Sequence, residues 1–205
     1  MIDCLDERAT KHFRGHWYGF GPVQDAEAVV FAVFQSTKIK NGRLTADSFD
    51  NKHLKRNAQS LARQSFVTRA IFEKAIVRGA ALQGIAVASA AAIRALVADV
   101  KLNADQISVR SLCVLDRVDE GDCDGHATAG YSERHASLGI SEAQLSKVRA
   151  RIRLDLANTF SEVRDLDSWK WPRYWALFVG RARSIVRVIT VLFRPQVVSP
   201  SSEPD

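Results

Sequence analysis

Short apolar runs alternate with polar, turn-forming segments along the first two thirds of the chain. Residues 27–35 are almost continuously apolar, carry several β-branched and aromatic side chains, and are bounded by Gly21-Pro22 before and Ser36-Thr37 after. Such a run is more typical of a buried strand than of a helix. Comparable runs predict further strands over residues 84–88, 107–115 and 126–131.

Between the predicted strands, apolar residues recur every three or four positions, which indicates helices. Asn41-Gly42 predicts a tight turn, because asparagine and glycine tolerate positive φ, and Thr45 is placed to cap a short helix over residues 47–55. The apolar positions of residues 60–78 predict a longer helix that ends at Arg78-Gly79.

Two serines mark the starts of further helices. Ser89 is placed to cap a helix that runs to about Val97. Ser141 and Gln144 have the spacing of a capping box, and the tryptophan-rich segment before Pro172 is the expected end of the helix that follows. One face of that helix is apolar and comprises Leu145, Val148, Ile152, Leu156, Phe160 and Val163.

This order of segments predicts an α+β fold with a small mixed sheet of about four strands packed with helices. We expect the globular domain to span residues 1–166. Residues 167–194 are predicted to form an amphipathic basic and aromatic C-terminal segment, in which residues 173–194 are either a helix or an edge strand. Residues 195–205 contain three prolines and three serines, which predicts a disordered tail.

The composition is that of a globular protein, with 46% hydrophobic and 25% charged residues. Three cysteines without a close pair favour a reducing compartment, and the charged N-terminus lacks the apolar run of a signal peptide. Arginines within residues 173–194 argue against a membrane span. These features predict a cytoplasmic protein.

The formal charge of +6 is unevenly placed, since residues 147–194 hold eleven Lys or Arg against four Asp or Glu. The polar face of the helix that starts at Ser141 is basic. Trp169, Trp171 and Trp175 follow it and have the character of stacking or anchoring side chains. The predicted binding residues are these tryptophans together with Lys147, Arg149, Arg151 and Arg153.

This charge pattern predicts an accessory binding protein that presents a basic face to a polyanionic or acidic partner. The partner classes are nucleic acid, an anionic lipid surface or an acidic protein. Basic and aromatic residues side by side in residues 173–194 would also suit peripheral membrane contact. The sequence does not determine the oligomeric state.

Residues 116–126 form an unusual stretch with five carboxylates, Cys123 and His126. An EF-hand register fails because its twelfth ligand position would be Tyr131. Cys123 and His126 have the spacing of one zinc-ligand pair, but a second pair is absent from the sequence. We therefore expect no metal and no cofactor, and interpret the stretch as a solvated turn between strands.

An alternative hypothesis is a small enzyme, a hydrolase or transferase, that uses this acidic turn, with or without a metal. In it His126 is the general base and Asp124 or Asp122 orients the imidazole. Ser60, Ser65 and Thr128 supply hydroxyl groups, although no nucleophile or phosphate-loop signature surrounds them.

Overall fold

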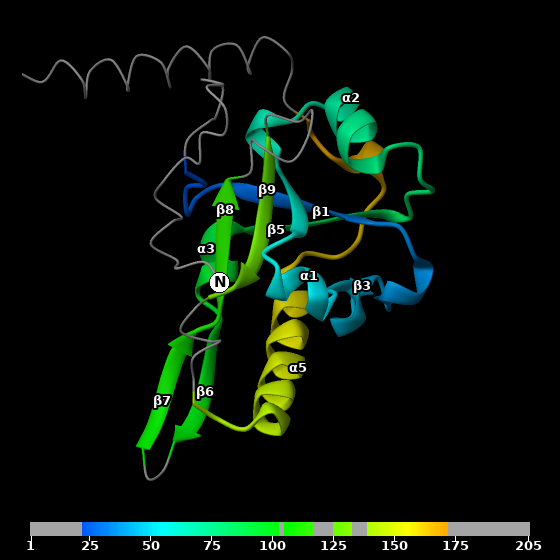
Figure 1. Ribbon diagram of the computed structural model, residues 1–205. Helices are drawn as coiled ribbons and strands as arrows, with labels where there is room; N and C mark the ends of the chain where they lie inside the picture. The colour runs from blue at the N-terminus through cyan, green and yellow to red at the C-terminus, as the bar shows by residue number, and fades with distance from the viewer. Residues whose placement is uncertain (1–21, 103–104, 117–124, 133–138, 172–205) are drawn as a thin grey trace, which may run out of the picture.

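The computed structural model describes residues 22–102, 105–116, 125–132 and 139–171, and within them the predicted α+β class is confirmed (Figure 1). A five-stranded sheet has the order β5-β1-β4-β9-β8, and every neighbouring pair is antiparallel. The predicted segment 173–194 and tail 195–205 lie outside the described residues. The strands are β1 (Ala28–Val33), β4 (Gln59–Arg63), β5 (Gly84–Ser89), β8 (Leu112–Asp116) and β9 (His126–Tyr131).

Alternation along β1 gives the sheet two apolar faces. Val29, Phe31 and Val33 pack into a larger core with α1 (Asn51–Lys55), α3 (Ala90–Arg94) and α5 (Glu142–Thr159). Val30 and Ala32 point into a smaller core, which Phe72 and Val67 complete from the segment of α2 (Arg69–Ile71) and the π-helical turn Phe72–Val77. Because both faces of β1 are covered, its sequence is apolar at every position.

The helix α5 begins as the sequence predicts and ends earlier. Ser141 forms both halves of a capping box with Gln144, whereas the helix stops at Thr159, well before Pro172. The ring of Phe160 packs 5.5 Å from that of Phe49, and the chain then runs along β5, where Ser161 N–H donates to the Val87 carbonyl at 2.8 Å. Tertiary packing therefore ends this helix.

The predicted helix over residues 60–78 is wrong in its first part. Residues 59–63 form β4, which lies between β1 and β9, and they are followed by the 3-10 turn Gln64–Phe66 and by α2. A strand buried on both faces has no clean alternation, so its apolar pattern resembles that of a helix. The predicted end is correct, because Arg78 and Gly79 adopt φ of 50° and 76°.

The predicted strand over residues 107–115 is two strands that separate at Ser111. β7 (Asp105–Arg110) pairs with β6 (Val97–Leu102) in a hairpin that projects from the main sheet (Figure 1), while β8 belongs to the sheet itself. The helix from Ser89 is shorter than predicted, since α3 ends at Arg94 and β6 begins three residues later.

Residues 34–58 form one excursion between β1 and β4. It contains the 3-10 turns Ser36–Lys38 and Ala46–Ser48, the hairpin β2 (Ile39–Lys40) and β3 (Arg43–Leu44), and α1. Asn41 and Gly42 occupy the hairpin turn with φ of 52° and 71°, as predicted. The predicted helix over residues 47–55 is divided, because Asp50 rather than Thr45 caps α1 by accepting from Lys52 N–H at 2.7 Å.

Two observations bear on the predicted location. Within the described ranges, no helix is both long enough and apolar enough to cross a bilayer. Cys113, fully buried in β8, is disulfide-bonded. Disulfides persist in oxidising compartments, so this bond weighs against the reducing compartment that the cysteine count favoured.

Candidate functional site

The predicted basic face of α5 is reduced by packing. Arg149 does not belong to it, because its side chain is only 9% exposed, pairs with Glu142 at 3.1 Å and lies over the Tyr131 ring. Arg153 is half-buried and donates to a backbone carbonyl in the preceding excursion. Arg151 is exposed but pairs with Asp155 at 3.0 Å. Lys147 alone of the four is exposed and without an ion pair to any described residue.

The predicted stacking tryptophans that the structure describes are both half-buried against the smaller core. The Trp171 ring lies 5.0 Å from that of Phe72, and its indole N–H donates to the Leu166 carbonyl at 3.3 Å. Trp169 packs into the same cluster. These two rings therefore serve packing, and Trp175 lies outside the described residues.

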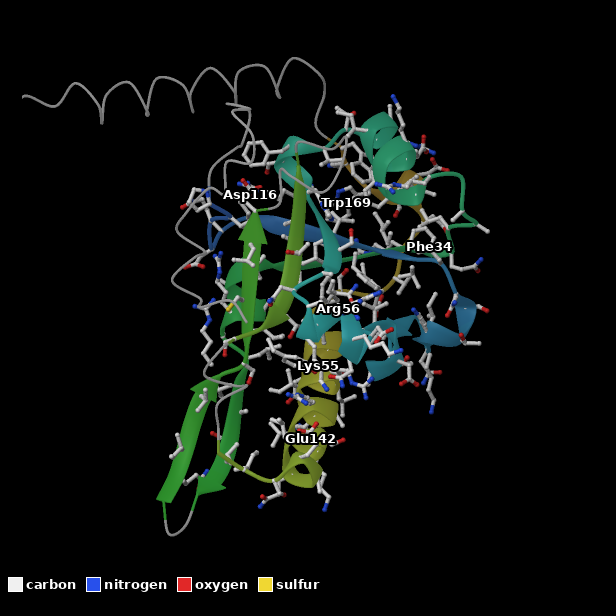
Figure 2. All side chains as sticks on the ribbon, in the orientation of Figure 1. Phe34, Lys55, Arg56, Asp116, Glu142 and Trp169 are labelled. Carbon is white, nitrogen blue, oxygen red and sulfur yellow. The ribbon has the colours of Figure 1, made fainter. Side chains whose placement is uncertain are left out.

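The excursion between β1 and β4 carries a group of cations that the described fold leaves largely without ion pairs. Residues 38–56 hold six Lys or Arg against two Asp, together with His53. Five of the six form no ion pair with any described residue, and Arg43 approaches Glu162 only at 3.9 Å. Lys55, at the end of α1, and Arg56, which follows it, are labelled in Figure 2. We call the side chains of Lys38, Lys40, Arg43, Lys52, His53, Lys55 and Arg56 the 38–56 basic face.

The backbone beneath this face is held by hydrogen bonds. The carbonyl oxygen of Lys38 accepts from Thr45 N–H and from the Ser48 hydroxyl, each at 2.9 Å. Asp50 caps α1, and α5 packs against the 3-10 turn Ala46–Ser48 and against β3. The basic side chains thus extend from a fixed support, and all of them except Lys38 are exposed.

A cavity of about 270 Å³ adjoins the basic face. β1 and β4 form ladder pairs only at Val29–Arg63 and Val30–Ala62, so the remaining lengths of the two strands separate. The cavity lies at that separation and is lined by both strands and by the excursion. Its lining comprises Phe31, Ala32, Phe34, Lys38, Ser48, Asp50, His53, Ala58, Gln59 and Ser60.

The pairing of β4 with β9 also brings together Ser60 and His126, which lie far apart in the sequence. Ala62 of β4 lies opposite His126 of β9, and Ser60 lies two residues away on the same face. The Ser60 hydroxyl and His126 Nε2 are 2.8 Å apart. His126 is buried, while Ser60 is half-buried and lines the cavity. Asp122 and Asp124, the predicted carboxylate partners, lie outside the described residues.

One carboxylate of the acidic stretch belongs to a buried ion cluster. Arg63 is 1% exposed and makes two 2.7 Å hydrogen bonds to the carboxylate of Glu27, while its third nitrogen lies 3.0 Å from Asp116. No sequence signal pointed to this cluster, because the predicted helix over residues 60–78 placed Arg63 on a helix. The cluster links the residue before β1 to the last residues of β4 and β8.

A second hollow, of about 490 Å³, lies beside α3. Its most prominent cation, Arg94, pairs with Asp25 at 2.6 Å and donates to the carbonyl groups of Val23 and Val114. These contacts hold the chain before β1 against α3 and β8. The Arg94 guanidinium therefore serves the packing of these segments.

No group of three or more His, Cys, Asp or Glu side chains suited to a metal ion occurs among the described residues. Cys123, one of the two zinc-spaced residues, lies outside them. No protein-family model, no curated protein and no solved structure matches this chain.

Proposed function

We propose that this chain is an accessory binding protein that presents the 38–56 basic face to a polyanionic partner. The observation that carries the proposal is a set of exposed cations, Lys40, Lys52, Lys55 and Arg56, that form no ion pair with any described residue. Cations already neutralised in the fold have little charge to offer a partner. Free ones can replace the counterions of a polyanion.

In this proposal the polyanion binds the excursion between β1 and β4, whereas the sequence predicted binding to α5. Lys147 on α5 keeps its predicted role, whereas Arg149 and Arg153 are excluded by their packing. The fixed backbone under the 38–56 basic face supports this location, because cations held on a rigid support lose less conformational freedom on binding.

The test is the salt dependence of binding to a fluorescent single-stranded oligonucleotide. The variant Lys52→Ala/Lys55→Ala/Arg56→Ala removes three charges from the face and should lower the slope of log K against log salt by about 2. The control Lys74→Ala/Arg164→Ala/Lys170→Ala removes the same charge from exposed positions elsewhere and should leave the slope nearly unchanged. Equal losses in both variants, or no binding by the unaltered chain at low salt, would contradict the proposal.

A second candidate function is a small hydrolase or transferase, which the Ser60–His126 hydrogen bond favours. An imidazole nitrogen 2.8 Å from a serine hydroxyl can accept its proton as the oxygen attacks an electrophile. In this hypothesis Ser60 is the nucleophile and His126 the base, beside the cavity that would hold the substrate.

A fluorophosphonate probe tests this hypothesis. The serine oxygen would form a bond to phosphorus as fluoride leaves, and the hydroxyl proton would pass to His126. Labelling should occur at Ser60 and be lost in Ser60→Ala and His126→Gln, with Ser65→Ala as the unaffected control, since Ser65 is exposed. An unlabelled chain of normal stability would remove the candidate.

A further inference from the structure

The cavity between β1 and β4 contains a buried polar group without a partner. Gln59 is 6% exposed and lines the cavity, and its Oε1 is inaccessible to water and has no hydrogen-bond partner among the described residues. A buried acceptor left in this state destabilises the fold. A ligand N–H group in the cavity would offset that cost once the amide turned this oxygen toward the cavity.

The same amide can meet a ligand with two kinds of group. A half-turn about the last side-chain bond exchanges the carbonyl oxygen and the NH₂ group, so Gln59 can accept or donate. The planar edge of a nucleobase offers both N–H donors and carbonyl or ring-nitrogen acceptors. The amide and a base edge are therefore complementary.

The apolar part of the lining suits a flat ring. Phe31 and Phe34 belong to the lining, and Phe34 is 37% exposed, so part of its ring is accessible. Ala32 and Ala58 add little bulk. Aromatic side chains give nucleobases a stacking surface that does not depend on sequence. The volume of about 270 Å³ fits one small ring-bearing group better than an extended chain.

The polar groups at the cavity favour an anion outside it. Lys38 and His53 belong both to the lining and to the 38–56 basic face. The carboxylate of Asp50, the acidic residue of the lining, already accepts from Lys52 N–H. The Ser60 hydroxyl is bonded to His126. A base inside the cavity would thus leave its phosphates beside cations.

We infer that the polyanion is a single-stranded nucleic acid, one base of which enters the cavity against Phe34 and Gln59 while its backbone follows the 38–56 basic face. The inference rests on the proposed function and names its partner class. A duplex would have to extrude a base first, which costs unstacking and unpairing energy. A lipid headgroup or an acidic peptide supplies charge but no nucleobase edge for Gln59.

The experiment compares two oligonucleotides of equal length and charge, one with bases and one abasic, by fluorescence anisotropy with the full chain. We expect the strand with bases to bind about five- to a hundredfold more tightly. Phe34→Ala should bring its affinity close to that of the abasic strand and leave abasic binding unchanged. Gln59→Leu should act in the same direction, and thermal melting checks that both variants are folded.

The outcomes separate this inference from the proposed function. Equal binding of the two strands, with a steep salt dependence, would overturn the inference and leave the basic-face proposal standing. Failure of both strands to bind at low salt would overturn both. Tighter binding to vesicles of anionic phospholipid than to either strand would replace nucleic acid by a membrane surface.

Discussion

At the residue scale, Arg63 shows how a charge is kept inside this fold. Its guanidinium contacts Glu27 and Asp116 and lies 4.5 Å over the ring of Phe66. A complete buried ion cluster contributes little net stability, because the loss of hydration opposes the attraction between charges. Removing one member is different, since it leaves the opposite charges buried and unpaired.

Replacing Arg63 by methionine should therefore destabilise the protein strongly. Two carboxylates, of Glu27 and Asp116, would lose their shared cation, and we expect the free energy of unfolding to fall by about 3 to 5 kcal/mol in urea titrations. Arg69→Met is the control, because the Arg69 side chain is exposed and solvent screens its ion pairs, so their loss should lower the free energy of unfolding little. A loss for Arg63→Met no greater than that of the control would show that the cluster is not formed.

Tyr131 gives a second prediction at this scale, on pH dependence. Burial raises the pKa of its phenol from 10.0 to about 12, although the nearby charges of Arg153 and Arg149 act to lower it. The folded state keeps this proton to a higher pH than the unfolded chain does. The contribution of the buried phenol to the free energy of unfolding is therefore complete below pH 10. It is lost as the pH rises towards 12, and amounts to about 3 kcal/mol at most.

Phenolate absorbance measures this directly. The chain has three tyrosines, and one of them should ionise near pH 12. Tyr131→Phe should abolish that late transition and flatten the loss of stability above pH 10. If the substitution instead removes a transition near pH 10, Tyr131 is not buried in solution.

At the element scale, the two ends of α5 have different origins. The start is local, because Ser141 and Gln144 satisfy each other's backbone N–H groups. The end is tertiary, because Phe160 packs with Phe31 and Phe49 and the next residues hydrogen-bond to β5. A local cap can be tested by a local substitution.

Ser141→Ala should lower the free energy of unfolding by about 1 kcal/mol, since it removes the side-chain acceptor of a helix N–H group. Ser146→Ala is the matched control, because Ser146 is an exposed serine within the same helix and alanine has the higher helix propensity. Chemical denaturation of both variants provides the measurement. A similar loss in each would argue against a capping effect.

At the scale of the whole molecule, the disulfide at Cys113 can be tested by thiol counting. The chain has three cysteines, and the bond occupies two of them. Alkylation of the unfolded, unreduced protein should modify one thiol, and alkylation after reduction should modify three. Three modified thiols without reduction would mean that the bond is absent and would restore the reducing compartment that the sequence favoured.

The sequence by itself determined the features that rest on neighbouring residues. The strand at residues 27–35, the Asn41-Gly42 turn and the cap at Ser141 all follow from local spacing and backbone preference. The α+β class followed from the order of such segments. These signals act over a few residues, so a single sequence is enough to identify them.

Only the tertiary structure decided the candidate sites. Which strand lies beside β4 determines that Ser60 meets His126, that Arg63 meets Asp116, and that a cavity opens where β1 turns away. Packing likewise decided that Arg149 is buried while Lys55 remains exposed. Contacts between residues far apart in the chain depend on which surfaces cover one another, and local spacing does not contain that information.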